Sequence, residues 1–429
     1  MTDPEGLRGE LQAWIAEHWS LEMPLREWWR ALADDGLSQP TLPPPFGRAM
    51  STTDAWVVLE ELARAGAVAP PQGGVGVKLA IPTIMRNGTV EQQRRFLLPL
   101  IRGEESWCQL FSEPGSGSDL ASVSTRAVRD GDRWIVQGQK VWNSAADIAR
   151  RGLLLARSNV DVPKHDGLSF FVLDMRQPGI EVRPLRQMNG ESEFCEVFVS
   201  GAVVRDDECL LGEGQGWKVA KSTLVAERTS AGSSRFHGLT FVPSGDPAGY
   251  LDRIVGEILA STDRTPRRFT GNAIPSRRLI ELARERGVSG EPLIRDALVR
   301  YFSMTMISRL NQARAGDLAT RGQPIASIAN ILKLHTAMIC RSSRDVAFQI
   351  LGPDGALSGP DSPYGGQIQT VSLASFGASI GGGTDEIQRT LIGEIGLDLP
   401  REQRVDLGVP FKELWKLADK GKAAQVDGS

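Results

Sequence analysis

The 429-residue sequence has few of the residues that mark metal centres, disulfide-rich folds and nucleic-acid binders. Its four cysteines and four histidines are scattered and include no Cys-x-x-Cys pair, which argues against a structural zinc site and a disulfide framework. The net charge is only −3 and no block of lysine and arginine occurs, so neither nucleic acid nor an anionic membrane surface is an expected partner. There is no apolar run of about 18 residues and no basic-then-apolar N-terminus. These absences predict a soluble, cytoplasmic protein without a membrane span, whose partner is a small molecule or another subunit.

What the sequence does contain is a change of hydrophobic period along the chain. Near the N-terminus, Leu7, Leu11 and Ile15 recur at helical spacing, and the same pattern continues to about residue 102. At Trp107 the period changes to two, and short runs bounded by Gly, Asp and Pro predict the strands of a small barrel or sandwich. After GEGQGW the helical period returns in long segments that suit an antiparallel bundle.

The predicted fold is therefore mainly α with a central β-domain. Residues 236–275 mix Gly, Pro and Arg around one short helical run, and we interpret them as an irregular insertion. The predicted segments are an N-terminal helical domain (1–105), a β-barrel domain (106–215), a C-terminal four-helix bundle that contains the insertion (216–400) and a C-terminal tail (401–429).

Two stretches near the start of the β-domain carry groups suited to a flat polar ligand. The loop in WCQLFSEPGSGSDLAS (residues 107–122) offers backbone N–H groups and small hydroxyls, although a plain surface turn has the same composition. In GQKVWNSAADIA, Trp142 and Ser144 are two residues apart on a predicted strand and therefore share a face. Such a pair can stack on an aromatic cofactor and bond its edge; alternatively, Trp142 is a core residue.

Three glycine-containing stretches mark helix ends. GEGQGW contains GxGxG but lacks the preceding strand and following acidic residue of a Rossmann fingerprint, so a tight turn into a helix is predicted. QILGPDG ends a helix with Gly352 at the C′ position. IGGGTDEIQR (residues 380–389) places Thr384 as the cap of a helix whose free N–H groups attract an anion. Taken alone, each of these stretches is an ordinary sequence for the start or the end of a helix.

Taken together and in this order, FSEPGSGSDLAS, GQKVWNSA, EVFVSGAVVRDDECLLGEGQGWKVA, AER, QILGPDG and GGGTDEIQRTLIGE resemble the acyl-CoA dehydrogenase family over nearly the whole chain. The predicted order of helices, β-barrel and helical bundle is also that family's architecture. The resemblance implies FAD as cofactor, an acyl-CoA as substrate and an electron-transfer flavoprotein as electron acceptor. It further implies a tetrameric enzyme of lipid β-oxidation.

The resemblance also assigns roles to individual residues. Those expected to contact FAD or substrate are Phe111, Ser112, Gly117 and Ser118 in the Gly/Ser loop, Trp142 and Ser144 along the isoalloxazine ring, Gln349 and the backbone of Gly352 at the FAD of a neighbouring subunit, and Thr384 and Gln388 at the last helix. Pro353 departs from the pattern, because the family has a second glycine there.

The expected chemistry needs a carboxylate that takes the α-proton of the acyl thioester, and donors that stabilise the thioester oxygen. Many family members carry this base directly before the Gly-Thr of the last helix, where this chain has Gly382, which retains only a backbone N–H. A minority carry it at the glutamate of a Glu-Arg pair on the helix after the barrel, matched here by Glu227 and Arg228. The resemblance therefore implies that Glu227 is the base. By spacing alone, the pair is typical of solvated surface charges.

A further departure leaves three functions open. The family's Arg and Phe at a partner subunit's FAD have only faint counterparts here, Arg268 and Phe269 in RRFTGNAIP and a second in RGQPIAS, and the role is transferred to neither. Some bacterial members with such departures are heterotetramers of two related chains that share fewer than four flavins. The first expectation is dehydrogenation to the trans-2-enoyl thioester. The alternatives are a non-catalytic partner subunit and a flavin oxidase on the same fold.

Overall fold

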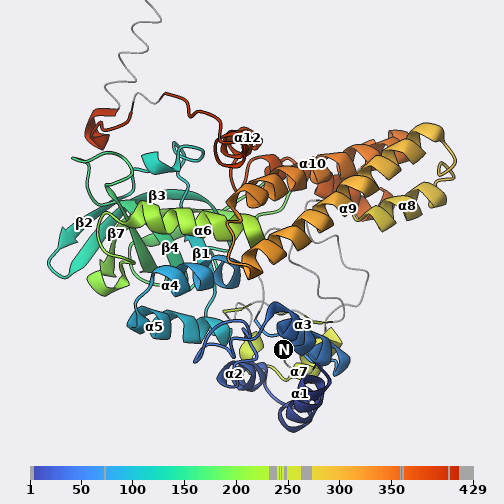
Figure 1. The fold of residues 1–429 in the computed structure, drawn as a ribbon, viewed down its shortest axis with the longest axis horizontal. Coiled ribbons are helices and arrows are strands. Elements are labelled where there is room, and N and C mark those ends of the chain that lie inside the picture. The colour runs from blue at the N-terminus through green and yellow to red at the C-terminus, as the bar shows by residue number, and fades with distance from the viewer. Residues whose placement is uncertain are drawn as a thin grey trace, which may run out of the picture.

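A computed structural model of the chain describes residues 4–71, 74–230, 239–240, 242, 244–245, 249–261, 273–357, 359, 362–403 and 406–414. Arg268 and Phe269 lie outside the described residues. Figure 1 shows a curled sheet with the N-terminal helices below it and a long helical bundle extending to one side. The predicted fold class, mainly α with a central β-domain, is confirmed.

The N-terminal helices pack around large apolar side chains. They are α1 (Pro4–His18), α2 (Leu25–Asp34), α3 (Thr52–Arg64), the π-helix η1 (Gly76–Ala80), α4 (Ile81–Asn87) and α5 (Val90–Ile101). The predicted apolar stripe of α1 is confirmed, since Leu7, Leu11 and Ile15 are buried. Thr89 caps α5, because its hydroxyl accepts a hydrogen bond from the Gln92 N–H.

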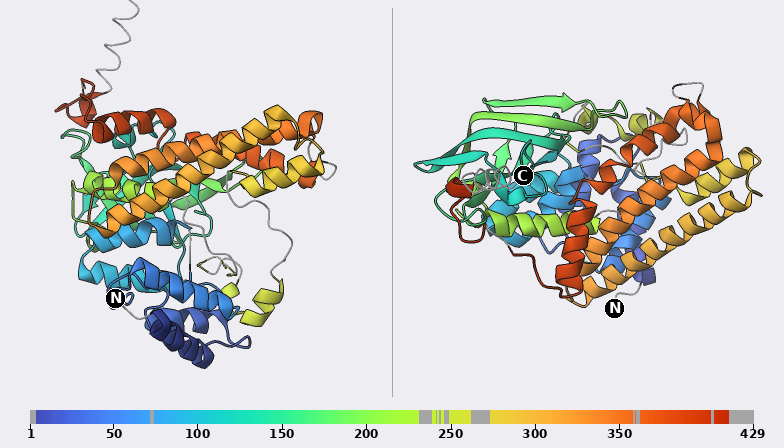
Figure 2. Two further views of the ribbon diagram at one scale, coloured as in Figure 1. Left: turned by 45° about the vertical axis from the view of Figure 1, so that its right-hand side comes forward. Right: turned by 90° about the horizontal axis from the view of Figure 1, so that it is seen from above.

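Part of the predicted insertion packs with the N-terminal helices and not with the bundle. It forms a short 3₁₀ turn, η4 (Tyr250–Asp252), and α7 (Val255–Ser261). Leu251 and Ile258 are buried in the same core as the side chains of α1 to α3. Figure 2 shows α7 beside the N-terminal helices and away from the long bundle. The chain therefore returns to its N-terminal region between α6 and the rest of the bundle.

Residues 107–205, all of them described, form one seven-stranded sheet. Its strands are β1 (Trp107–Leu110), β2 (Arg126–Asp130), β3 (Arg133–Ser144), β4 (Arg151–Arg157), β5 (Leu168–Asp174), β6 (Ile180–Leu185) and β7 (Phe194–Arg205). The order is β1-β4-β2-β3-β7-β6, with β5 paired to β4; β1 and β2 run parallel to β4, and the other pairs are antiparallel. β5 is buried along nearly its whole length, which explains why LSFFVLD is continuously apolar.

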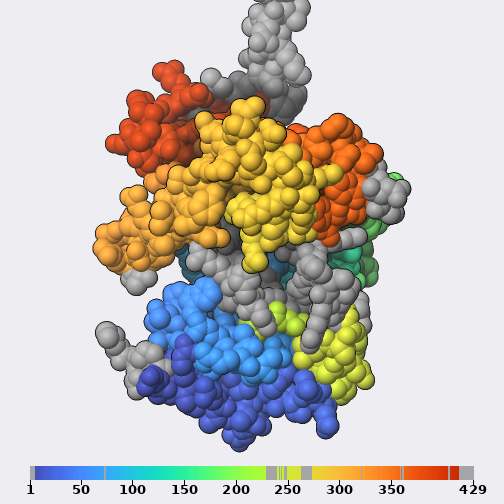
Figure 3. All heavy atoms as spheres, turned by 90° about the vertical axis from the view of Figure 1, so that its right-hand side faces the viewer, coloured from blue at the N-terminus to red at the C-terminus, as the bar shows by residue number. Residues whose placement is uncertain are grey.

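The C-terminal helices begin on the sheet and extend beyond it. They are α6 (Gly216–Ser230), α8 (Ser276–Glu285), α9 (Pro292–Thr320), α10 (Ala326–Leu351), α11 (Gln367–Ala374) and α12 (Asp385–Leu391), which continues into the π-helix η8 (Ile392–Gly396). The apolar core that joins α4 and α5 to β4, β5 and α6 fixes the helices around the sheet. Figure 3 shows the bundle standing over the N-terminal helices.

The C-terminal segment contacts the region of the sheet. Residues 406–414 return to the sheet, where the Phe411 N–H donates to the carbonyl of Val162 at 2.9 Å. Among the described helices, none combines the length and the apolar character needed to cross a bilayer.

Candidate active site

A cavity of about 460 Å³ lies where the N-terminal helices, the sheet and α6 meet. Residues 74–79, which include most of η1, form one wall, and the end of β3 forms another. Glu227 from α6 and Ser144 from β3 both line it. Two side chains that are far apart in the sequence, and that were expected to act together, therefore share one cavity. A π-helix in the wall is a feature often found at functional sites.

Glu227 is half-buried near the C-terminal end of α6. Its Oε2 accepts a long hydrogen bond from Gln109 Nε2 at 3.5 Å. Burial raises the pKa of Glu227, while the Gln109 bond and the charges of Arg228 and Lys333 oppose that rise. Arg228 is also partly buried and donates to Asn330 Oδ1 at 3.2 Å. Interpreting Glu227 and Arg228 as a solvated surface pair is therefore wrong.

The glycine turn before α12 lies against the Glu227 carboxylate. Gly382 and Gly383 both have positive φ, at 67° and 89°. A Cβ on Gly382 would lie 3.3 Å from Glu227 Oε1, and one on Gly383 would lie 2.6 Å from Gln388 Nε2. The backbone conformation therefore favours glycine at both positions, and a side chain at either one would displace the end of the Glu227 or the Gln388 side chain. The Glu227 carboxylate fills the space into which a side chain at 382 would point.

Thr384 caps α12 as predicted, since its Oγ1 accepts from the Ile387 N–H at 3.3 Å. The expected attraction of an anion to this helix start is not supported. Asp385 and Glu386 already place two carboxylates in the first turn. Gln388 is fully buried, and its Nε2 donates to the Gly382 carbonyl at 2.9 Å, so its visible role is to shape the turn. Contact of Thr384 or Gln388 with FAD stays a prediction.

Trp142 is not a core residue, because 61% of its surface is exposed. Its φ is 63°, and the pairing of β3 with β7 shifts register between Lys140 and Asn143. The indole ring packs edge-on against Phe194, with ring centroids 6.0 Å apart. Asn143 is buried between Trp142 and the half-buried Ser144. Trp142 and Ser144 therefore both lie on the less buried side of the strand, as predicted, although a bulge interrupts it.

The predicted Gly/Ser loop divides into a buried and an exposed part. The Phe111 side chain is buried against Phe170, so only its backbone can reach a ligand. The carbonyl of Ser112 accepts from the Val141 N–H at 2.9 Å, which ties the loop to the strand that carries Trp142. Gly117 and Ser118 are exposed.

A buried ion pair holds this loop in place. Lys140 Nζ lies 2.9 Å from Glu113 Oε1 and also donates to the Phe111 and Leu155 carbonyls. Burial alone would raise the pKa of Glu113, but the Lys140 charge and several hydrogen bonds lower it to about 2. The pair thus fixes the backbone of the predicted cofactor loop at its buried end.

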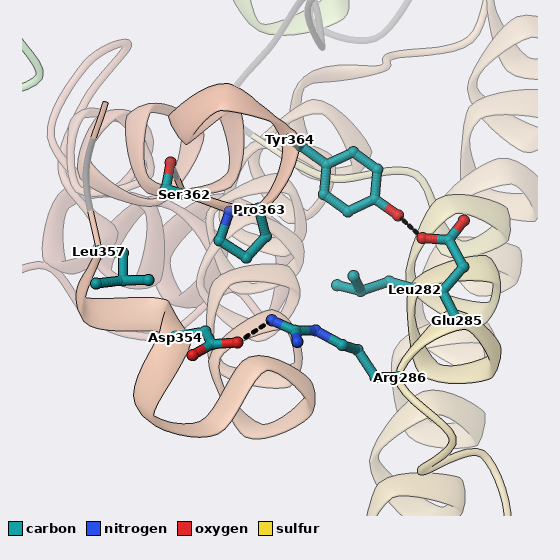
Figure 4. A pocket seen from close by; sticks show the side chains of 8 residues that line it. All are labelled: Leu282, Glu285, Arg286, Asp354, Leu357, Ser362, Pro363 and Tyr364. Atoms are coloured by element: carbon teal, nitrogen blue, oxygen red, sulfur yellow. Dashed lines mark hydrogen bonds and ion pairs between the residues drawn. The ribbon is translucent and has the colours of Figure 1, made fainter. Parts of the chain in front are cut away.

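Gln349 and Gly352 lie at the far end of α10 and do not line the cavity that contains Glu227. Gly352 ends the helix with a φ of 57°, as predicted for a C-terminal glycine, and both residues are exposed. A second cavity, of about 450 Å³, lies beside this end of the bundle and contains an Arg286–Asp354 ion pair and a Tyr364–Glu285 hydrogen bond (Figure 4). A role for Gln349 and Gly352 at a cofactor therefore requires a neighbouring subunit.

Two residues near Glu227 are absent from the sequence-based assignment. Gln109 is the second residue before Phe111 in the quoted loop stretch, on the strand that leads into it. Lys333 lies between Leu332 and Leu334 in the mainly apolar stretch ANILKLHTAM of α10, and it is buried. A lysine in such a run is the signal that marks it, since lysine is rarely buried without a partner.

The arrangement fits a flat aromatic cofactor such as FAD. The Ser144 hydroxyl lines the cavity that contains the Glu227 carboxylate, and the exposed Trp142 indole is two residues away on the same strand. A Cβ added to Gly115 or Gly117 would meet no atom within 4 Å, so the exposed loop leaves open space for a ligand beside its backbone. Neutral hydroxyls, backbone N–H groups and aromatic faces are suited to hold such a group.

Three domain families match the chain. They are the acyl-CoA dehydrogenase N-terminal domain at residues 7–104, the middle domain at 108–201 and the C-terminal domain at 275–397. The sequence is 42% identical over 405 residues to acyl-CoA dehydrogenase FadE34 of Mycobacterium tuberculosis, covering 94% of this chain but only 50% of FadE34. It is 34% identical over 427 residues to acyl-CoA dehydrogenase IpdE1 of the same species, covering 94% of this chain and 100% of IpdE1. The solved Tcur3481-Tcur3483 steroid ACAD matches with a TM-score of 0.67 at 25% identity, over 93% of this chain and 98% of that one.

Proposed function

The chain belongs to the acyl-CoA dehydrogenase family, and on that premise we propose that it is an FAD-dependent enzyme that converts an acyl-CoA thioester to the trans-2-enoyl-CoA. The observation that carries the proposal is the meeting of Glu227, Ser144 and the Gly382 turn at one place. Removal of the α-proton requires a carboxylate that faces the cavity, whereas a subunit that only completes a partner's flavin site does not. This observation favours a catalytic chain.

In the proposed mechanism Glu227 takes the α-proton of the thioester. The proton becomes removable when hydrogen bonds hold the thioester oxygen, and the backbone N–H of Gly382 is our candidate donor. Gly382 also leaves the approach to Glu227 open, because no side chain stands in front of the carboxylate. FAD, when bound, supplies the acceptor for the hydrogen and electron pair that leave the β-carbon. Walls that keep water away from the reacting atoms would favour transfer of the α-proton to Glu227 over its exchange with solvent.

Among the residues that we propose to hold FAD, Ser144 lines the cavity that contains Glu227. We propose that one group of residues contacts the FAD bound by the same chain. They are Phe111, through its backbone, and Ser112, Gly117, Ser118, Trp142, Ser144, Thr384 and Gln388. Gln349 and Gly352 would meet the FAD of a neighbouring subunit, since they are exposed at the far end of α10.

We propose that the acyl group is bulky, as in the steroid enzyme to which the chain is similar. A cavity of about 460 Å³ lies within the ordinary range for small-molecule sites, about 300–1,000 Å³.

The assembly that we propose is a tetramer, either of this chain alone or with a related chain. One face of α9 exposes large apolar side chains at helical spacing, and a face of this kind marks a contact with another subunit. Its members are Val299, Phe302, Met306 and Leu310. We propose a cytoplasmic location and an electron-transfer flavoprotein as the acceptor, in keeping with a role in β-oxidation.

The test is anaerobic bleaching of bound FAD by acyl-CoA compounds, with straight-chain and steroid-side-chain thioesters in one panel. Glu227→Gln keeps the shape of the side chain but cannot take a proton. It should reduce the bleaching rate by about 10²–10⁴-fold while thioester binding is retained. Glu61→Gln, the same change at a buried carboxylate outside the cavity, is the matched control and should bleach normally when folded.

The same assay separates the alternatives. Equal rates in the wild-type and Glu227→Gln proteins would remove Glu227 from the mechanism. FAD that binds but bleaches with no member of the panel would favour the partner-subunit function. Rapid formation of hydrogen peroxide from reduced protein in air would favour an oxidase.

A further inference from the structure

Lys333 approaches the space beside Gly382 from α10. A Cβ on Gly382 would lie 3.8 Å from Lys333 Cε and 3.3 Å from Glu227 Oε1. The lysine side chain and the carboxylate therefore border the same small volume, and they reach it from different helices. Only 7% of the Lys333 surface is exposed.

The Lys333 ammonium is not matched by a hydrogen bond. Within the described part of the chain its Nζ has no hydrogen-bond partner, and its one ion-pair contact is Asp385 Oδ1 at 3.9 Å. The other oxygen of Asp385 accepts from Arg341, so this carboxylate is shared between two cations. Because a buried charge is costly unless it is paired, the remaining positive charge of Lys333 favours a second anion nearby. Glu227 is that anion.

We propose that Lys333 is a positioning residue that keeps the Glu227 carboxylate ionised at the cavity. This inference rests on the proposed function, in which only the ionised carboxylate accepts the α-proton. Arg228 is the neighbouring cation on the same helix, but its guanidinium is directed to Asn330. Lys333 belongs to α10. The ionisation of Glu227 therefore depends on how α10 packs against the glycine turn.

Within the described part of the chain, groups from three elements act on Glu227. Gln109 on β1 donates to it, and Arg228 on α6 and Lys333 on α10 oppose the rise of its pKa, whose main cause is burial. Burial lowers the pKa of Lys333, and the charges of Asp385 and Glu227 counteract that change. The Gly382 turn itself brings no charge. Removing Lys333 therefore removes one of the two cations that act on the base.

The experiment measures the titration of Glu227 directly, in protein without substrate. Difference infrared spectra over a pH series follow the protonated carboxyl band, and Glu227→Gln identifies the band that belongs to this residue. A nearby opposite charge shifts a carboxyl pKa by roughly 1–3 pH units. Lys333→Met should therefore move the Glu227 midpoint upward by about that amount, and Lys333→Arg should restore it. The bleaching rate falls at low pH as Glu227 becomes protonated, and the midpoint of this fall should move to higher pH by the same amount.

Lys164→Met is the matched control, because Lys164 is also buried and ion-paired, in its case to Asp119 and Asp406. It should leave the Glu227 midpoint unchanged. If Lys333→Met lowers the melting temperature but moves neither the Glu227 midpoint nor the midpoint of the fall in bleaching rate, Lys333 is only structural and the proposal is overturned. Should the Met variant not fold, Lys333→Gln takes its place against Lys333→Arg. A shifted midpoint in a protein that turns over no acyl-CoA would support the inference and refute the proposed function.

Discussion

Replacement of Trp142 by alanine should weaken cofactor binding and leave folding nearly unchanged. A tryptophan side chain buries roughly 150–250 Å² when covered. With 61% of the residue exposed, a ring stacked on one side would cover about half of that exposed part, roughly 50–75 Å². At about 25 cal/mol/Å² this is worth about 1–2 kcal/mol, and stacking adds about 1 kcal/mol. The dissociation constant for FAD should therefore rise roughly 30- to 150-fold.

The folding cost of the same change should be small. Exposed substitutions change the free energy of unfolding by about 0.5 kcal/mol or less, whereas a core tryptophan would cost about 3–5 kcal/mol. Alanine also has a Cβ, so the positive φ at residue 142 strains both proteins equally. The assay pairs fluorescence titration of the apoprotein with FAD and urea unfolding, and Trp56→Ala on α3 is the control for loss of another exposed indole. A Trp142→Ala protein that loses several kcal/mol of stability yet binds FAD normally would refute the reasoning.

Two further predictions concern the pH dependence of stability, which Glu227 should affect, and the number of subunits in the assembly. Because burial raises the pKa of Glu227 in the folded state, the ionised form costs stability that the protonated form does not. Below the ordinary value of 4.5, Glu227→Gln and the wild-type protein should unfold at the same urea concentration. As the pH rises through the raised pKa, the wild-type protein should become the less stable of the two, and equal stability at about pH 8 would contradict this. In analytical ultracentrifugation we expect a tetramer or a dimer of heterodimers, and a uniform monomer with one FAD per chain would rule out the neighbouring-subunit roles of Gln349 and Gly352.

The parts of the fold that could be predicted from the sequence are decided by residues close together in the chain. Thr89 and Thr384 cap helices, and Gly352 ends one, because the groups that satisfy a helix end lie within a few residues of it. The change of period at Trp107 likewise reports a local choice between helix and strand. β4 is harder to identify, since RGLLLAR is a short apolar run without the alternation that distinguishes a strand from a buried helix.

Other features depend on contacts between distant segments and leave little trace in the local pattern. The packing of α7 against α1 to α3 is one, because an amphipathic segment does not specify which core it joins. The conformation of Trp142 is another. Its left-handed backbone and the register shift beside it arise from the pairing of β3 with β7. An exposed tryptophan in this setting is visible only once both strands are placed.

The relation between Glu227 and Gly382 shows most clearly what the three-dimensional arrangement adds. In sequence they are two separate departures, a glutamate on one helix and a missing side chain before another. In the structure a Cβ at 382 would point at the Glu227 carboxylate from 3.3 Å, so the two positions compete for one space. Two carboxylates there would repel each other, with Lys333 and Arg228 as the opposing charges that both would need. A glutamate at 382 would also have to adopt a φ of 67°, which costs about 1–2 kcal/mol for a residue with a Cβ. In the proposed mechanism the glycine at 382 therefore goes together with a base on α6, and a base at 382 would require the turn itself to change.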